Sequence, residues 1–302
     1  MKRLLRTLSL ATALTAAGCL GDIRTDDTFR QQLIVEGRIE ADGPAEVLLT
    51  TNLAAIGTIA EETLEGAVVR WAKVTVSDGE RSEVLTGYRD ERCMTGFVYR
   101  SNRILGRTGG RYVLTVEYSG LTLTAETTIP EPVGLDEVEA VKVDGEHYTV
   151  RARFRDPEGK NAYLFECRTE GGERETRYFR PALLGIVDDS LFPDHRCEVT
   201  VNRPLDYVHI GDYSQYFHRD ERVVVRFSAL GDFGYRFWSL FEDEVLNALN
   251  PVFPSTANLP SNIEGGGRGI WCGYASSRYE AHWPESQDGG SDDGPDSGRD
   301  DK

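Results

Sequence analysis

Three acidic side chains lie close together in one short stretch, and their carboxylates could bind a metal ion. Asp188, Asp189 and Asp194 lie in the stretch VDDSLFPD, and carboxylate oxygens are the ligands that Ca²⁺ takes. The stretch lacks the alternating aspartates and the distal glutamate of a calcium-binding loop. An ordinary acidic loop is therefore the favoured interpretation, and we predict no metal here.

A second stretch, LDYVHIGDYSQYFHRDE, combines histidines with a carboxylate and two tyrosines. His209 and His218 flank Asp212, Tyr213 and Tyr216, and imidazole with carboxylate is a plausible transition-metal pair. Two histidines nine residues apart, with no third ligand in view, are a weak signal. A loop that covers a sheet edge with aromatic side chains is favoured, and the sequence predicts no cofactor.

Arginines that alternate along predicted strands could bind an anion, because guanidinium groups bind carboxylate or phosphate through two parallel hydrogen bonds. The arginines of this basic stripe are Arg151, Arg153, Arg155, Arg222 and Arg226. The competing interpretation is that they form cross-strand ion pairs with Glu166 or Glu198, which satisfies the same charges without a ligand. Pairing is favoured, and the anion site is the alternative.

Aromatic side chains near the end of the predicted fold could stack on a sugar or a peptide. They are Trp271, Tyr274, Tyr279 and Trp283. Most Trp and Tyr residues of a β-sandwich belong to its core or rim instead. The patterns HExxH, GxSxG and GxxxxGK[ST] are absent, as is GxGxxG after a strand, so we predict no catalytic residue and a protein that is not an enzyme.

The N-terminus carries an export signal. Lys2, Arg3 and Arg6 precede an apolar run over residues 8–17, and the small residues 16–18 come directly before Cys19. About ten apolar residues are too few to span a bilayer of about 30 Å as a helix. Residues 1–18 are therefore predicted to be a lipoprotein signal peptide, and Cys19 to be the acylated N-terminus of the mature chain, with residues 19–30 as an acidic tether.

The four cysteines beyond Cys19 would meet an oxidising compartment after export. They are Cys93, Cys167, Cys197 and Cys272. An even number allows up to two disulfides in three connectivities, and buried free thiols are the other interpretation. Their spacing matches no zinc-ligand pattern, which calls for close pairs.

The charge of the chain limits its partners. The formal net charge is −16, and the acidic residues 285–302 contain no large apolar side chain, so we predict a disordered tail there. An acidic body lacks the clustered positive charge that nucleic acid or an anionic membrane face requires. No nucleic-acid partner is expected.

Short alternating segments indicate strands through most of the body. The clearest is a hairpin over residues 112–130 with a tight turn at Ser119-Gly120, and Tyr148, Val150, Ala152 and Phe154 alternate with the arginines. A helix is predicted over residues 233–249, with an aromatic stripe that docks on the core. We predict a mainly β fold of two β-sandwich (immunoglobulin- or fibronectin-like) domains, over residues 31–131 and 132–284, the second with one helix.

Several segments carry a family resemblance, among them LIVEGRIEADGPAEVLLTTN, GGRYVLTVEYSGLTLTAETTIPEPV and NPVFPSTANLPSNIEGGGRGIWCGYASS. Together with the lipoprotein signal, they resemble the Bacteroidota surface lipoproteins grouped as domain of unknown function 4249, from about Gln31 to Ser277. The most specific part holds Asn250, Pro251, Pro260, Ser261, Asn262, Ile263, Gly265 and Gly266. The resemblance implies a two-domain envelope lipoprotein, often encoded beside TonB-dependent transporters, and no known activity.

These observations predict a non-catalytic accessory lipoprotein, held on the outer membrane by acyl chains on Cys19 and facing outward, with a periplasm-facing orientation as the alternative. Its expected partners are the membrane, through those chains, and a TonB-dependent transporter that it assists in capturing a nutrient or ligand. A surface structural or adhesive module without a transport role is the alternative. A hydrolase is the third candidate, and the ligand is not identified by the sequence.

Overall fold

The computed structural model divides the chain into residues 1–31 and a compact unit over residues 32–302. It describes residues 32–52, 66–93, 95–172, 175–176, 178–204, 213–248 and 259–284. The predicted signal peptide, Cys19, the tether and the acidic tail lie outside these ranges. So do His209, Asp212, Asn250 and Pro251.

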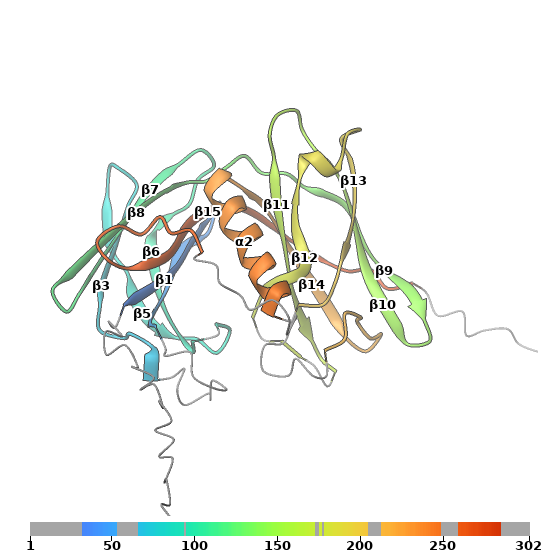
Figure 1. The fold of residues 1–302 in the computed structure, drawn as a ribbon, viewed down its shortest axis with the longest axis horizontal. Coiled ribbons are helices and arrows are strands. Elements are labelled where there is room, and N and C mark those ends of the chain that lie inside the picture. Colours follow the sequence, from blue (N-terminus) through green and yellow to red (C-terminus); the bar gives the residue numbers. More distant parts are fainter. Residues whose placement is uncertain are drawn as a thin grey trace, which may run out of the picture. The chain divides into compact units, whose positions relative to one another are not determined.

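The fold is mainly β, as predicted (Figure 1). The N-terminal strands are β1 (Leu33–Glu40), β2 (Pro44–Thr51), β3 (Lys73–Ser77), β4 (Ser82–Val84), β5 (Thr86–Arg89), β6 (Phe97–Leu105), β7 (Arg111–Tyr118) and β8 (Leu121–Thr128). The later elements are β9 (Leu135–Asp144), β10 (His147–Arg155), β11 (Ala162–Glu170), β12 (Arg180–Asp188), the short 3₁₀ helix η1 (Asp189–Leu191), β13 (Arg196–Val201), β14 (Arg222–Leu230), α2 (Asp232–Ala248) and β15 (Arg268–Glu280).

One sheet of eight strands joins the two halves of the chain, in the order β12-β11-β14-β15-β1-β2-β6-β5. Strand β15 makes the connection. Its residues 268–274 pair with β1 in parallel, and its residues 274–280 pair with β14 in antiparallel. The domain boundary near residues 130–132 stays a prediction, and part of the range 132–284 pairs with an N-terminal strand.

Two smaller sheets pack against this large one and complete a sandwich arrangement. One has the order β4-β3-β7-β8, the other β13-β10-β9. Val74 and Val76 of β3 and Leu114 and Val116 of β7 are buried at alternate positions, as a half-buried strand requires. The predicted hairpin is β7–β8, and its turn residues Ser119 and Gly120 both have positive φ angles, of 49° and 80°.

Helix α2 covers part of the opposite face of the large sheet (Figure 1). Phe237 packs with Leu164, Leu230 and Ile270, and Trp238 Nε1 donates a hydrogen bond of 3.0 Å to the Tyr274 hydroxyl. The aromatic stripe therefore docks on the core, as the helical spacing predicts. The described helix begins one residue before the predicted range and ends at Ala248.

Candidate functional site

Charged side chains occupy the same face of the large sheet as α2. They come from four adjacent strands, β1, β15, β14 and β11, and form what we call the buried charge cluster. Its members are Arg38, Glu40, Glu166, Arg226 and Arg278. Glu166, Arg226 and Glu40 are each less than a tenth exposed, which is rare for ionisable residues unless they are paired.

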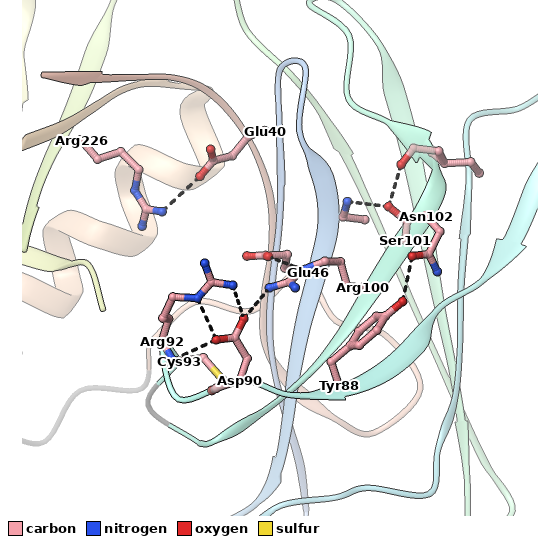
Figure 2. Close-up of polar contacts among 12 residues, drawn as sticks. Glu40, Glu46, Tyr88, Asp90, Arg92, Cys93, Arg100, Ser101, Asn102 and Arg226 are labelled. Carbon is pink, nitrogen blue, oxygen red and sulfur yellow. Dashed lines mark hydrogen bonds and ion pairs between the residues drawn. The ribbon is translucent and has the colours of Figure 1, made fainter. Parts of the chain in front are cut away.

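Arg226 is the centre of this cluster. It lies opposite Glu166 in the pairing of β14 with β11, and its Nε donates to Glu166 Oε2 over 2.6 Å. Its Nη1 donates to Glu40 Oε1 over 3.2 Å, across the width of β15 (Figure 2). Fork-shaped arginine contacts of this kind fix the geometry of both partners. Arg226 therefore links β11 to β1.

Two further arginines complete the cluster around the same carboxylates. Arg278 Nη2 donates to Glu40 Oε2 over 2.7 Å, and Arg38 Nη2 lies 3.0 Å from Glu40 Oε1. Arg226 and Arg278 are opposite each other in the pairing of β14 with β15. Like charges facing each other are destabilising by themselves, and Glu40 offsets this repulsion by contacting both.

The surrounding charges keep both carboxylates ionised. Burial by itself raises the pKa of Glu166, but Arg226 and Arg38 outweigh it and bring the pKa down to about 2. Burial likewise raises the pKa of Glu40, and Arg38, Arg226 and Arg278 together leave it below its usual value. A carboxylate that stays ionised at neutral pH is a poor general acid, so the cluster is better suited to holding strands or contacting an anion than to proton transfer.

Aromatic rings cover the guanidinium groups. The ring centroid of Phe179, in the segment before β12, lies 4.4 Å from Arg226 Cζ and 5.8 Å from Arg278 Cζ. The ring centroid of Tyr274 lies 4.5 Å from Arg38 Cζ. Such cation–π contacts are stabilising, most of all away from water. The Arg278 side chain is 51% exposed, so it is the edge of the cluster that an external group can reach.

All four described cysteines are free thiols. Burial raises the pKa of Cys272 to about 12 and that of Cys197 to about 11, and it raises the pKa of Cys93 and Cys167 as well. Of the two interpretations open from the sequence, the structure has the free thiols. A thiol whose pKa is raised forms little thiolate at neutral pH and is a weak nucleophile.

The sequence matches a family described as a domain of unknown function, DUF4249, over residues 22–280. The chain belongs to this family. No curated protein matches the sequence. Among solved structures, the chain is similar to the FN1-FN3 domains of chicken CNTN1, with 9% identity and a TM-score of 0.22, over 83% of this chain and 67% of that one.

The described residues of the segment predicted to be the most specific part of the family resemblance support strand β15. Asn262 Oδ1 accepts from Trp271 N over 2.9 Å, and its Nδ2 donates to Trp271 O over 2.8 Å, where β14 no longer pairs. Ser261 Oγ accepts from Gly269 N over 3.1 Å. Gly265 has a φ of +92°, and a Cβ there would lie 2.1 Å from Thr122 O. These motif residues have architectural roles.

The basic stripe predicted from the arginines does not form as one surface. Arg151 and Arg153 lie on β10 in the three-stranded sheet, whereas Arg222 and Arg226 lie on β14 in the large sheet. Arg153 Nε donates to Glu198 Oε2 over 2.8 Å, and Arg151 Nε donates to Glu139 Oε1 over 2.9 Å. Cross-strand pairing, the favoured alternative, is therefore what the structure shows.

Arg155 continues the alternation at the end of β10. It is exposed and lies opposite Arg196 of β13 in the strand pairing. Anion binding by Arg151, Arg153 and Arg155 stays a prediction. The pairing partners Glu137 and Glu139, both on β9, were not identified from the sequence, because nothing local indicates which strand will lie beside β10.

The aromatic stacking surface predicted around Trp271 is wrong for that residue. Trp271 is fully buried, and its Nε1 donates to Tyr112 O over 3.1 Å, which joins β15 to β7. Tyr279 accepts from Leu135 N over 2.9 Å, and the Trp283 ring packs edge-on against Tyr148. Trp271 is therefore a core residue, and Tyr279 and Trp283 pack against the core while partly buried.

Neither stretch weighed as a metal site contains a ligand set in the described residues. Asp188 accepts from Ser190 N over 3.0 Å and from the Tyr235 hydroxyl, as the cap of η1. His218 contacts His147, a neighbour that the sequence reasoning missed. Within the described ranges, no group of three or more His, Cys, Asp or Glu residues is placed to hold a metal ion.

A second ion-pair group, on β2 and β6 and the turn after β5, was also missed. Asp90 accepts from Arg92 Nε and from Arg100 Nη2, both over 3.0 Å, and Arg100 Nε donates to Glu46 over 2.7 Å (Figure 2). Hydrogen bonds from Arg92 hold the pKa of Asp90 well below its usual value. The Cys93 thiol, which is partly buried, donates to Asp90 O in the same turn.

Proposed function

We propose that the chain is an outer-membrane lipoprotein, anchored through acyl chains on Cys19 and facing outward, that works as a non-catalytic accessory to a TonB-dependent transporter. The observation that carries this proposal is the export signal ending in Ala16-Ala17-Gly18-Cys19. Two or more acyl chains hold a protein stably on a membrane, whereas one chain is marginal.

The length of chain between Cys19 and the described body bears on the proposed anchor. Among the described residues, no helix combines the length and the apolar character needed to cross a bilayer. The body begins at Gln32, and residues 20–31 connect it to Cys19. A segment of twelve residues reaches at most about 43 Å, which would keep the body near the membrane surface.

The chemistry of the buried charge cluster and of the cysteines supports binding rather than catalysis at these groups. The carboxylates of the buried charge cluster stay ionised, and the thiols have raised pKa values. Catalytic sites usually show the opposite tuning, with an acid or a nucleophile whose pKa lies near the working pH.

Membrane fractionation of the full-length chain tests the anchor. The unaltered protein is expected in the membrane fraction, and Cys19→Ser is expected in the soluble fraction, because serine carries no thioether-linked lipid. Cys93→Ser is the matched control, and it is expected to stay with the membrane. If Cys19→Ser remains with the membrane, the anchor proposal is wrong.

Affinity purification from detergent-solubilised outer membranes tests the partner. A TonB-dependent transporter is expected to co-purify with the tagged lipoprotein after mild cross-linking. Repeated recovery without a transporter, together with normal nutrient-limited growth of a deletion strain and altered surface attachment, would instead support the structural or adhesive module.

A further inference from the structure

Trp71 is the most exposed large apolar residue of the described chain, with 91% of its surface accessible. A tryptophan side chain offers a large apolar area with a polar N–H, so an exposed one can contact an apolar or interfacial surface outside the protein. Its neighbours Ala67, Val68 and Val69 are buried, and Arg70 is exposed. The chain therefore leaves the core at Arg70 and presents the indole to its surroundings.

A buried tyrosine holds Trp71 in this position. The Tyr99 hydroxyl donates to Val69 O and accepts from Ala72 N, both over 3.0 Å. Val69 N also donates to Leu49 O over 2.9 Å. These hydrogen bonds fix the backbone on both sides of Arg70 and Trp71. The fold therefore holds the Trp71 backbone in place while its indole is exposed.

Trp71 lies at the end of the molecule where the chain from Cys19 enters the fold. Leu33, the first residue of β1, pairs with Thr51, and the neighbouring Thr50 bridges to Val68. Asn52 N donates to Gln32 O over 2.9 Å at the same end. Residues 68–71 are therefore beside the beginning of the body.

A second apolar side chain lies at this end. Lys73, at the start of β3, is opposite Glu117 of β7, so the turn between β7 and β8 follows on the same side as Trp71. Leu121, which follows that turn, is 42% exposed. The end of the molecule that receives the tether thus presents a tryptophan and a leucine to its surroundings.

We propose that Trp71 is a membrane-interface contact, and that its indole enters the headgroup region of the membrane that holds the acyl chains of Cys19. This inference rests on the proposed lipid anchor. Tryptophan favours the interface because its ring is apolar and its N–H remains near water. The anchor keeps Trp71 close to the surface, so even a weak second contact is occupied often.

The charge of the protein indicates which lipid surface suits this contact. The chain has a formal net charge of −16, so an anionic membrane face repels it as a whole. Arg70 and the ion pair between Lys73 and Glu117 leave only a small positive charge beside the indole. A zwitterionic surface such as phosphatidylcholine is therefore the appropriate probe.

Fluorescence quenching by brominated lipid tests the proposal. Full-length lipidated protein is incorporated into vesicles of phosphatidylcholine that carry bromine near the headgroup end of the acyl chains. We expect bromine to reduce the tryptophan emission of the unaltered protein, and the reduction to disappear in Trp71→Ser. Trp283→Phe, which keeps an aromatic ring against Tyr148, is expected to retain it.

Flotation of the same vesicles separates failure of the contact from failure of the anchor. Trp71→Ser is expected to float with the vesicles through its acyl chains, and Cys19→Ser is expected to be lost from them. If the unaltered protein floats without quenching, or if quenching persists in Trp71→Ser, the Trp71 contact is wrong and the anchor stands. Cross-linking from position 71 to a protein in native membranes, without quenching, also overturns it.

Discussion

Two regions of this protein use the same residue types with opposite access to water. The buried charge cluster combines arginine and glutamate on β1, β11, β14 and β15, where Arg226 and Glu166 are 7% and 3% exposed. A second group, which we call the exposed ladder, also combines arginine and glutamate, on β9, β10 and β13. The side chains of its Arg153 and Glu198 are 39% and 57% exposed. The members of the exposed ladder are Arg151, Arg153, Glu137, Glu139 and Glu198.

The difference in exposure decides how much each pair matters. Water solvates a broken pair in the exposed ladder, so each pair there contributes little to the stability of the fold. In the buried charge cluster, removal of one partner leaves the remaining charges only partly compensated and away from water. The contribution of an ion pair in a sheet to the free energy of unfolding therefore depends on how deeply the pair is buried.

The largest expected effect is the loss of Arg226. Arg226→Met keeps much of the side-chain volume but leaves Glu166 and Glu40 short of a partner, and we expect about 3–5 kcal/mol of destabilisation. Arg153→Met is the matched control in the exposed ladder, with a much smaller expected change in the free energy of unfolding. Urea unfolding of both variants measures the two values. Equal losses would show that burial does not separate the two regions.

A double variant tests whether the destabilisation caused by Arg226→Met comes from the charge that it leaves without its partner. Glu166→Met combined with Arg226→Met removes both partners and leaves Arg38 and Arg278 with Glu40. We expect the double variant to be more stable than the sum of the single losses predicts, by about 0.5–3 kcal/mol. Urea unfolding of the single and double variants gives this coupling. Simple additivity would mean that the two side chains stabilise the fold independently.

Acid should reduce the contribution of the buried charge cluster. Glu166 has a pKa of about 2 in the fold and an ordinary value of 4.5, so the folded state binds this proton less readily than the unfolded state does. The stabilisation is complete above about pH 4.5 and is lost as the pH falls towards about 2. Unfolding midpoints of the unaltered protein and Glu166→Gln, measured from pH 6 to pH 2.5, should therefore converge.

Glu198→Gln provides the comparison for this titration in the exposed ladder. The hydrogen bond that Arg153 donates lowers the pKa of Glu198, but water screens this pair. We therefore expect only a small difference in unfolding midpoint between the unaltered protein and Glu198→Gln at every pH. If the difference in unfolding midpoint between the unaltered protein and Glu166→Gln widens as the pH falls, the assigned direction of the Glu166 pKa shift is wrong.

The smallest expected effect concerns salt. Ions screen exposed charges over about 10 Å at 0.1 M salt and screen buried pairs much less. The destabilisation caused by Arg153→Met should therefore shrink between low salt and 0.5 M salt, whereas that of Arg226→Met should change little. Urea midpoints at both salt concentrations test this. Similar salt dependence in the two variants would indicate that water reaches both regions.

Local patterns in the sequence predicted the elements of the fold well. The alternation from Tyr148 to Phe154 gave strand β10, and the apolar spacing with Ser119-Gly120 gave the β7–β8 hairpin. Both features depend on residues close together in the chain, which is why they can be read without a structure. The same alternation placed the arginines on the outer face of β10 correctly.

The partners of those arginines depended on strands far apart in the chain. The sequence offered Glu166 and Glu198 as partners, and both are used, but it did not identify Glu40, which pairs with Arg226 across 186 positions. The exposure of Trp71 was missed as well, because its apolar neighbours resemble a core strand. The hydrogen bonds from Tyr99, which hold that segment, are also long-range.

The sequence by itself determined the mainly β fold, the long helix and the membership of DUF4249, and it is the source of the proposed lipid anchor at Cys19. These follow from periodicity and from short motifs, which act locally. Only the tertiary structure decided that β15 joins both halves of the large sheet, that Trp271 is buried, and that Arg226 is buried whereas Arg153 is exposed. Burial depends on which distant segments exclude water from a side chain, and that is fixed only when the chain has folded.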